Sequence, residues 1–268
     1  MSKNLDDLVI REVTADVWIF SRPFTRARFI PFGGRSTAIK LTSGDVWVLA
    51  STPLTQDTKE TIDKLGPVKW IMAGDAEHHL FLAEYKKAYE NAKLVVVERL
   101  LKKKTDEGLD VAGAYGVDPP ETEYGFESEI KAHYFPGFVN QDVAFYHVAS
   151  KSLIVADLLF NLPGTEQYSK SKSSSKVPII CKLNPSGVVL KTLLFKLGKD
   201  KDAMRRDIKA VSEWDFSRII MCHGDVIEED AHKAWKDAYA NARGATSPTF
   251  DFVHRDVSYG LDQNLSSS

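Results

Sequence analysis

Short apolar runs constrain the fold of this chain more than any other feature. Each run has four or five residues, is apolar at nearly every position and is bounded by polar or turn-forming residues: Val46–Ala50, Val68–Met72, Leu94–Val97 and Arg218–Cys222. Such a run is typical of a strand that is buried on both faces of a sheet. Between the first two runs, Thr55 is a suitable N-cap for a helix over Gln56–Lys64, which Gly66 and Pro67 end. This alternation indicates an α/β fold, or α+β in another classification.

Both halves of the chain begin with strands and continue with helices. The first half has strand patterns over Leu8–Glu12, Val17–Phe20 and Ser36–Leu41 before Val46–Ala50, and a helical spacing of Phe81, Tyr85 and Ala88 after Val68–Met72. The second half has strand patterns over Ala132–Phe135, Val143–His147 and Leu153–Val155, then helical patterns over Val188–Leu197, around Met204, Ile208 and Val211, and over Glu228–Tyr239. This repeat predicts two sheets packed face to face with helices outside.

Three segments lack such patterns. Lys102–Gly108 is densely charged and is expected to be solvated. Tyr168–Lys176, with the sequence YSKSKSSSK, is expected to be a loop. The periodicity is lost again from Gly244 onward. We therefore predict one domain over residues 1–243 and a loosely docked C-terminal tail over residues 244–268.

The composition narrows the classes of function. The net charge is −2, and a general nucleic-acid binder would carry a basic excess. The two cysteines, Cys181 and Cys222, lie far apart, so a disulfide framework is excluded and a reducing compartment is the simpler interpretation. The N-terminus does not resemble a secretory signal, and no run of about 18 apolar residues could span a membrane. We expect a cytoplasmic protein that acts on a small molecule, without a nucleic-acid or membrane partner.

Ligand-capable side chains follow three of the predicted strands. The hexapeptide Gly74-Asp75-Ala76-Glu77-His78-His79 comes directly after Val68–Met72. Asp157 follows the strand Leu153–Val155, and His223 follows Arg218–Cys222. Strand ends are where α/β proteins place ligands, and carboxylates and imidazoles are the ligands of zinc, iron and manganese. The coincidence of three such strand ends indicates a metal site.

Each of these residues also has a purely structural interpretation. Glu77, His78 and His79 could cap a helix that starts near Leu80. Asp157 alone would more often be a turn residue, and His223 alone would more often be a strand-end histidine bonded to the backbone.

These positions resemble the metallo-β-lactamase superfamily over about residues 8 to 240. That family has a His-x-His-x-Asp-His motif after a strand, then a Pro-Gly-His turn, a Gly-Asp pair and a final His-Gly. The resemblance implies a four-layer αββα sandwich. The strand Ser36–Ile39, the following Gly44–Val48 and the pair His78-His79 are more similar to an uncharacterised branch of the superfamily.

The first metal site of the family is not preserved in this resemblance. If His78 matches the last histidine of the motif, Asp75 takes the place of the second histidine and Ala73 that of the first. The Pro-Gly-His turn appears as Pro136-Gly137-Phe138. Alanine and phenylalanine side chains cannot bind metal, so the resemblance implies that this first site is absent.

The second metal site of the family is matched at every position. Its four ligand places are taken by Glu77, His78, Asp157 and His223, and a shift of one residue would exchange His78 for His79. The resemblance therefore implies one divalent metal, with zinc first and iron or manganese as alternatives.

The chemistry that the resemblance implies is hydrolysis of a small-molecule ester, lactone, thioester or phosphoester. A mononuclear metal with an open position polarises such substrates and activates water. Asp75 would then orient or deprotonate the water, and Asp225 would hold an imidazole N–H of a ligating histidine.

Two other functions stay open. The loss of ligands at Ala73 and Phe138 is also typical of a catalytically inactive module that binds a small ligand or a protein without metal. Alternatively, an aspartate or histidine in the same cleft could act as a general base without any metal.

The segment Phe20–Arg35 mixes arginines with aromatic residues. We predict that Arg26 and Arg28 bind a substrate with an anionic group and an apolar body. The alternative is a solvated hairpin with packed aromatic rings.

Overall fold

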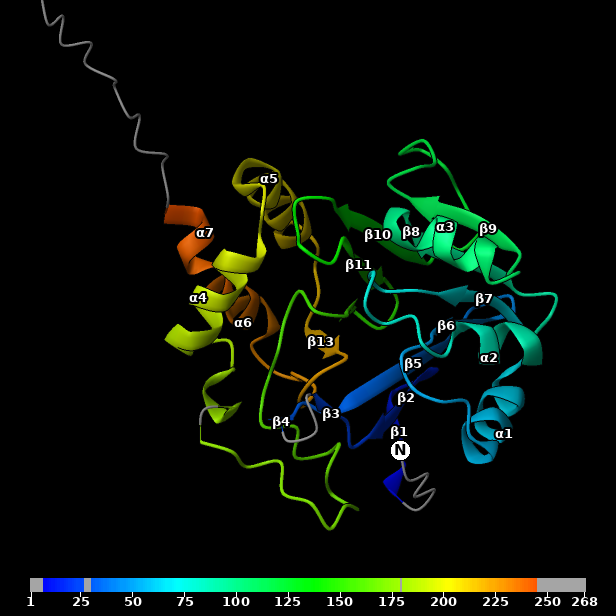
Figure 1. Cartoon of the computed structure of the whole chain (residues 1–268), viewed down its shortest axis with the longest axis horizontal. Coiled ribbons are helices and arrows are strands. Elements are labelled where there is room, and N and C mark those ends of the chain that lie inside the picture. Colours follow the sequence, from blue (N-terminus) through cyan, green and yellow to red (C-terminus); the bar gives the residue numbers. More distant parts are fainter. Residues whose placement is uncertain (1–6, 27–29, 179, 245–268) are drawn as a thin grey trace, which may run out of the picture.

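Two large sheets form the centre of the computed structural model, which describes residues 7–26, 30–178 and 180–244 (Figure 1). The seven-stranded sheet has the order β1 (Val9–Thr14), β2 (Val17–Arg22), β5 (Gly34–Lys40), β6 (Val46–Leu49), β7 (Val68–Met72), β8 (Lys93–Val97) and β9 (Val111–Tyr115). The four-stranded sheet has the order β10 (Ile130–Phe135), β11 (Asp142–His147), β12 (Ser152–Val155) and β13 (Arg218–Met221). A short separate hairpin joins β3 (Thr25–Arg26) and β4 (Ile30–Pro31).

Helices cover the outer faces of both sheets. Those on the first sheet are α1 (Gln56–Leu65), α2 (Leu82–Ala88) and α3 (Glu98–Asp106). Those on the second are α4 (Val188–Leu197), α5 (Lys201–Ser212), α6 (Ala231–Ala238) and α7 (Ala240–Gly244), with a single 3₁₀ turn over Ile180–Lys182 before α4. The predicted arrangement of two sheets with helices outside is confirmed. None of the described helices is long and apolar enough to cross a bilayer.

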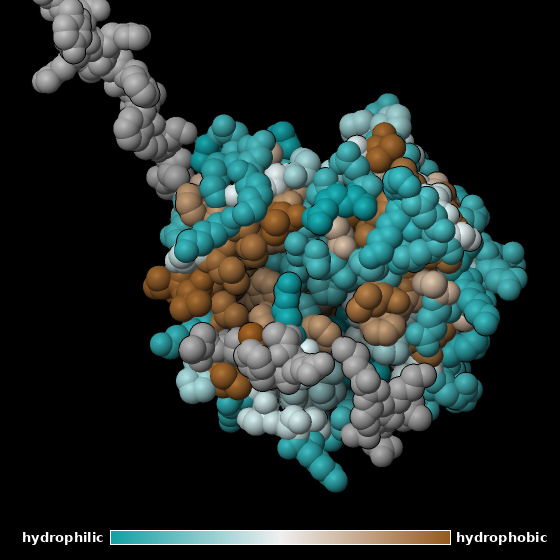
Figure 2. All heavy atoms as spheres, in the orientation of Figure 1, coloured by the Kyte–Doolittle hydropathy of each residue, from teal (hydrophilic) through white to brown (hydrophobic). Residues whose placement is uncertain are grey.

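The surface in Figure 2 is mostly hydrophilic, but a hydrophobic patch lies where Figure 1 draws α4. Val188 and Val189 at the start of this helix are 75% and 40% exposed.

The directions of the strands determine at which edge of a sheet the loops after them come together. Strands β1, β2, β5 and β6 form an antiparallel meander, and β6, β7, β8 and β9 then run parallel. In the second sheet, β12 and β13 are parallel neighbours, with Val155 opposite Met221. Parallel neighbours end at the same edge of a sheet, so the residues after β12 and β13 emerge side by side.

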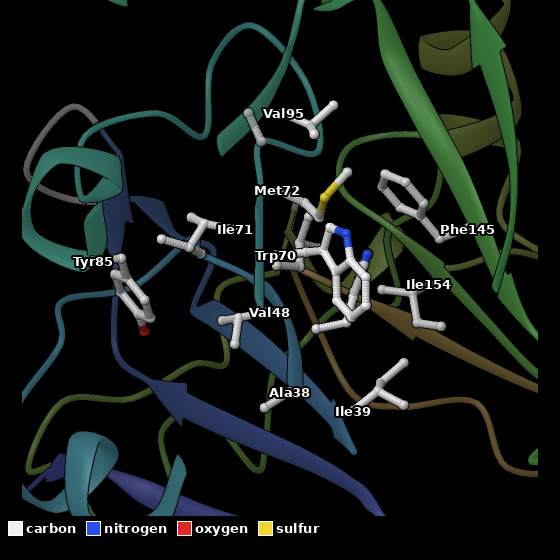
Figure 3. Close-up of a cluster of buried hydrophobic side chains, with 14 of the residues drawn as sticks. Ala38, Ile39, Val48, Trp70, Ile71, Met72, Tyr85, Val95, Phe145 and Ile154 are labelled. Atoms are coloured by element: carbon white, nitrogen blue, oxygen red, sulfur yellow. The ribbon is translucent and has the colours of Figure 1, made fainter. Parts of the chain in front are cut away.

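The core between the sheets is dominated by large aromatic and branched side chains. Phe145 and Ile154 of the second sheet face Trp70, Met72 and their neighbours from the first sheet (Figure 3). Trp47 is fully buried, and its ring centroid lies 5.0 Å from that of Phe145 in an edge-to-face arrangement.

A second core lies between the four-stranded sheet and its helices. Leu153 and Val155 of β12 belong to this second core, whereas Ile154 belongs to the first. The alternation along one strand explains why β12 is apolar at consecutive positions: a strand between two cores needs apolar side chains on both faces.

Most predicted elements are confirmed within one or two residues, and Thr55 caps α1 by accepting from the backbone N–H of Thr58. The expectation that Lys102–Gly108 is solvated is confirmed except at Lys104, although the segment is not irregular, because α3 continues to Asp106. Lys104 within it is only 3% exposed and pairs with Glu107. Strand β9 was not predicted at all. Residues 245–268 of the predicted tail lie outside the described residues.

We expect Trp47→Ala to destabilise the protein by about 3–5 kcal/mol, because it removes the aromatic contact between the sheets and leaves a cavity. Urea unfolding measures this loss, with Leu80→Ala as the control, since Leu80 is 69% exposed. The control should change stability by less than about 0.5 kcal/mol. Equal stability of the two variants would contradict the assigned core.

Candidate metal centre

Three loops meet at one edge of the two sheets. Asp157 follows β12 and His223 follows β13, at the edge where these parallel strands end. The loop after β7 is held against the second sheet by backbone hydrogen bonds from Val143 N to Gly74 O and from Ala76 N to Asn140 O. These contacts bring His78, which is remote in sequence, to the same place.

The side chains of His78, Asp157 and His223 converge there. His78 Nε2 lies 3.1 Å from His223 Nε2, and His223 Nε2 lies 3.4 Å from Asp157 Oδ1. One ligand atom from each of the three residues lies within 4.8 Å of the others. Asp157 and His223 are buried, and the side chain of His78 is only 12% exposed.

Hydrogen bonds at the other ring nitrogens fix the direction of both imidazoles. His223 Nδ1 lies 2.6 Å from the carbonyl oxygen of Gly33, which can only accept, so Nδ1 carries the proton. His78 Nδ1 lies 2.9 Å from Asp75 Oδ1, and an ionised carboxylate likewise only accepts. In their neutral forms, both histidines therefore direct an Nε2 lone pair toward the same point.

This arrangement fits a metal ion. Two lone pairs 3.1 Å apart repel unless a proton or a cation lies between them, and the buried Asp157 Oδ1 has no hydrogen-bond partner in the structure. Zinc binds nitrogen and oxygen at about 2.0–2.1 Å, which places neighbouring ligands of a tetrahedral site about 3.4 Å apart. The observed separations match this spacing, and three protein ligands would leave one position open.

Asp75 acts on His78 rather than on the open side of the cluster. Its Oδ1 accepts hydrogen bonds from the backbone N–H groups of Glu77 and His78 and from the His78 ring. Burial raises the pKa of Asp75, but the charge and hydrogen bonds of His78 outweigh burial and lower it below its usual value. Burial lowers the pKa of His78, and Asp75 outweighs it in the same way, raising that pKa well above its usual value. A carboxylate behind a ligating histidine orients the ring and raises its basicity.

The other two ligands have distinct electrostatics. Burial, reinforced by the charge of His78, lowers the pKa of His223 to about 3, so its imidazole is neutral near pH 7. Burial raises the pKa of Asp157 to about 6, against the opposing charge of His78.

A second buried carboxylate, that of Asp142, supports Asp157. It accepts from the backbone N–H of Asp157 at 2.8 Å, and Asn140 donates to Asp157 Oδ2 at 2.6 Å. Burial and the charges of Asp75 and Asp157 raise the pKa of Asp142 well above its usual value. Neither Asp142 nor Asn140 was predicted as a site residue, because only the fold brings them to Asp157.

The turn that carries His223 is held by two buried side chains. Arg35, 1% exposed, donates to the carbonyl oxygens of Met221 and Gly224 at 2.6 and 2.7 Å and pairs with Glu166 at 3.1 Å. Gln167 donates to Cys222 O and accepts from Gly224 N. The alternative interpretation of Phe20–Arg35 as a solvated hairpin is therefore wrong for Arg35.

Several predicted site residues lie outside the three-residue cluster. Glu77 is exposed, and His79 is turned toward α3, where its Nε2 accepts from Lys103 at 3.0 Å. The predicted role of Asp225 was wrong: its carboxylate accepts from Thr165 and from Glu166 N, and Gly33 holds the His223 ring instead. The interpretation of Glu77, His78 and His79 as a helix cap was also wrong, because α2 starts at Leu82 and no side chain caps it.

Of the two arginines predicted to bind substrate, the structure describes only Arg26. Arg26 is exposed in β3, and its positive charge lowers the pKa values of both Asp157 and His223, so it is close enough to the cluster to act on it electrostatically. Arg28 lies outside the described residues.

An aromatic wall surrounds the His223 ring. Phe160 stacks on it with centroids 5.6 Å apart and planes 6° apart. Phe32 packs edge to face at 5.5 Å, and the partly exposed Phe24 stacks at 6.2 Å. This wall excludes water from one side of the cluster and offers an apolar surface beside Arg26.

The family model described as a domain of unknown function, DUF4336, matches residues 16–177. Among curated proteins, none matches the chain.

Solved structures are similar over most of the chain. A metallo-β-lactamase from Pontibacter korlensis is 12% identical, with a TM-score of 0.55, over 89% of this chain and 100% of its own. A mono-zinc metallo-β-lactamase from Pseudomonas aeruginosa is 11% identical, with a TM-score of 0.56, over 88% of this chain and 95% of its own. A flavo di-iron protein from Thermotoga maritima is 13% identical, with a TM-score of 0.63, over 90% of this chain and 63% of its own. This similarity shows the metallo-β-lactamase fold, which is the fold that the sequence motifs imply.

We expect Asp75→Asn to weaken zinc binding by about 10- to 100-fold, because it removes the negative charge that orients and polarises His78. Competition with a chromogenic chelator measures the affinity. Glu77→Gln is the matched control, two residues away and with the same change of charge, and should leave the affinity nearly unchanged because Glu77 is exposed and outside the cluster. A larger loss in Glu77→Gln than in Asp75→Asn would contradict this assignment.

Metal affinity should rise with pH, because a metal must displace protons from Asp157 and His78. The pKa of Asp157 is about 6, so this carboxyl contributes to the rise below about pH 6. The pKa of His78 is raised well above its usual value, so His78 continues the rise above pH 6, whereas the imidazole of His223 is already neutral. The slope approaches tenfold per pH unit for each displaced proton. Zinc affinity that is constant between about pH 6 and pH 8 would exclude His78 as a ligand.

Proposed function

We propose that this chain, which belongs to the DUF4336 family and has the metallo-β-lactamase fold, is a hydrolase that uses one divalent metal. The observation that carries the proposal is the convergence of His78, Asp157 and His223 on one point. Hydrogen bonds at the Nδ1 atoms of both histidines fix the direction of their rings. Zinc suits this donor set best, since two imidazoles and a carboxylate with an open position are typical of catalytic zinc sites. Iron and manganese accept the same ligands.

The bound metal would supply Lewis-acid chemistry, polarising a carbonyl or phosphoryl oxygen and lowering the pKa of water. The protein residues would perform the remaining tasks. Asp75 and the Gly33 carbonyl hold the two imidazoles, and Asn140 holds the Asp157 carboxylate. These contacts fix the ligand atoms before substrate arrives, so little reorganisation is needed during the reaction.

The proton released from water needs an acceptor at the open side of the cluster. Asp75 Oδ1 is occupied by His78 and two backbone N–H groups, and Asp75 Oδ2 has no hydrogen-bond partner among the described residues but is buried. The interaction with His78 lowers the pKa of Asp75, which argues against the role of general base that the sequence predicts for it. Glu77 is exposed, makes no side-chain hydrogen bond or ion pair with any described residue, and its charge raises the pKa of Asp157. We therefore assign Glu77 as the proton acceptor.

The walls of the site favour a substrate with an apolar body and an anionic group. Phe24 and Phe32 supply the apolar contact next to His223, and Arg26 supplies a positive charge beside it. Esters, lactones, thioesters and phosphoesters that carry a carboxylate or phosphate all have this character.

A catalytically inactive binding module is the second candidate. It is supported by Phe138, which takes a ligand place of the family but is 2% exposed and packs in the second core. A module of this kind would bind the same anionic, apolar ligands without turnover.

Hydrolysis assays on zinc-loaded protein with anionic aryl esters, lactones, thioesters and phosphoesters separate the two functions. We expect turnover of at least one class, with kcat lowered by about 10²- to 10⁴-fold in Glu77→Gln, because that change removes the proton acceptor. Arg26→Ala should raise KM for anionic substrates and leave neutral analogues unaffected. Arg22→Ala, in the neighbouring strand β2, is the matched control. Ligand binding without turnover of any class would overturn the hydrolase and support the binding module.

A further inference from the structure

The start of α4 presents apolar side chains to solvent. Val188 is 75% exposed and Val189 40% exposed, although the opposite face of the helix is buried through Leu190 and Leu194. Figure 2 shows this surface as a hydrophobic patch at the left of the molecule, where Figure 1 draws α4. An exposed aliphatic pair on a well-packed helix indicates contact with something outside the chain.

The segment around this patch is strongly basic. Residues 168–201 contain eight lysines and a single acidic residue, Asp200. The whole chain has 35 basic and 37 acidic residues, so the rest of the sequence carries an acidic excess. Positive charge is therefore concentrated in the segment that holds the exposed apolar residues.

Most of these lysines are available for an external partner. Five exposed ones make no side-chain hydrogen bond or ion pair with any described residue: Lys172, Lys176, Lys182, Lys196 and Lys199. Lys201 is different, because it donates to the carbonyl oxygens of Phe195 and Gly198 at the end of α4. The carboxylate of Asp237 pairs with Lys233, accepts from Ser186 and interacts with Lys191, so it offsets the charge of one lysine of the segment and leaves the five exposed ones unpaired.

The chemistry of this surface distinguishes a lipid from a protein partner. Protein interfaces are enriched in tyrosine, tryptophan and arginine and depleted in lysine. The segment 168–201 has eight lysines and no arginine, although Arg205 lies beside the end of α4, and its most exposed apolar residues are aliphatic. Lysines around an aliphatic patch are typical of helices that lie in the headgroup region of anionic membranes.

We propose that α4 and the lysine-rich segment before it bind the surface of a membrane that contains anionic lipids. Val188 and Val189 enter the headgroup boundary, and the lysine side chains extend along the apolar surface to the phosphates. We expected no membrane partner from the sequence because no run of about 18 apolar residues could span a bilayer, but binding at the surface needs no spanning helix. This proposal is independent of the metal centre and of the hydrolase.

Vesicle co-sedimentation of the full chain tests the proposal. Vesicles of phosphatidylcholine alone are compared with vesicles containing about 30% phosphatidylserine. Wild type is expected to sediment with the anionic vesicles, more weakly as salt is raised, and not with the neutral ones. Lys182→Gln/Lys196→Gln/Lys199→Gln should weaken binding by about fivefold for each lysine removed. Val188→Ser/Val189→Ser removes apolar surface without changing charge and should weaken it by on the order of tenfold.

Matched controls use the same substitutions on other faces. Lys64→Gln/Lys87→Gln/Lys131→Gln changes the net charge equally at exposed positions of α1, α2 and β10, and Val117→Ser removes a valine that is 52% exposed. Both controls should bind like wild type. Absence of wild-type sedimentation with anionic vesicles at low salt would overturn the proposal and leave an acidic protein as the partner. Equal binding by the α4 variants and the controls would overturn it as well.

Discussion

The two imidazoles that point their Nε2 atoms at each other are the constraint on which the candidate centre depends. Asp75 Oδ1 behind His78 and the Gly33 carbonyl behind His223 leave neither ring free to turn away. The resulting 3.1 Å separation is unfavourable for two neutral imidazoles unless a proton or a metal lies between them. The raised pKa of His78 and the lowered pKa of His223 place that proton on His78, so a metal would bind here by displacing one proton.

Much of the surrounding structure serves to maintain this arrangement. Buried Arg35 and Gln167 hold the carbonyl and N–H groups of the turn around His223. Asp142 holds the backbone of Asp157, and its raised pKa avoids a third negative charge beside Asp75 and Asp157. Burying a charged arginine is costly unless its donors are satisfied, and Arg35 meets this condition through Ser21, Glu166 and the two carbonyl oxygens of the turn.

The region of the family's first metal site has become part of the core. Phe138 packs with the helices of the second sheet, and Ala73 is fully buried at the end of β7. Apolar side chains therefore stand where the resemblance places ligands of another metal. His78, Asp157 and His223 could hold one ion, and Ala73 and Phe138 offer no ligand for a second one beside it.

The sequence predicted the elements whose signals are local. Strands β6, β7, β8 and β13 are short apolar runs, and α1 has a capping threonine, so each could be found from its own residues. Strand β9 was missed because Val111–Tyr115 contains glycine and two alanines and lacks a clear strand pattern. Within the centre, His78, Asp157 and His223 were found because each follows a strand. The Gly33 carbonyl could not be found, because a backbone acceptor leaves no trace in the identity of a residue. Arg35 was misjudged because its partners Glu166 and Gly224 lie 131 and 189 residues away.

Elemental analysis of the purified wild-type protein, beside His78→Ala and His223→Ala, tests whether His78, Asp157 and His223 hold one metal ion. We expect about one zinc, iron or manganese ion per chain in the wild type and its loss in both variants, since three ligands are the minimum for a catalytic site of this kind. His147→Ala serves as the control, because His147 lies in β11 and bonds to Ser150, away from the cluster. A wild-type protein that neither contains metal nor takes up any of the three ions would contradict the account.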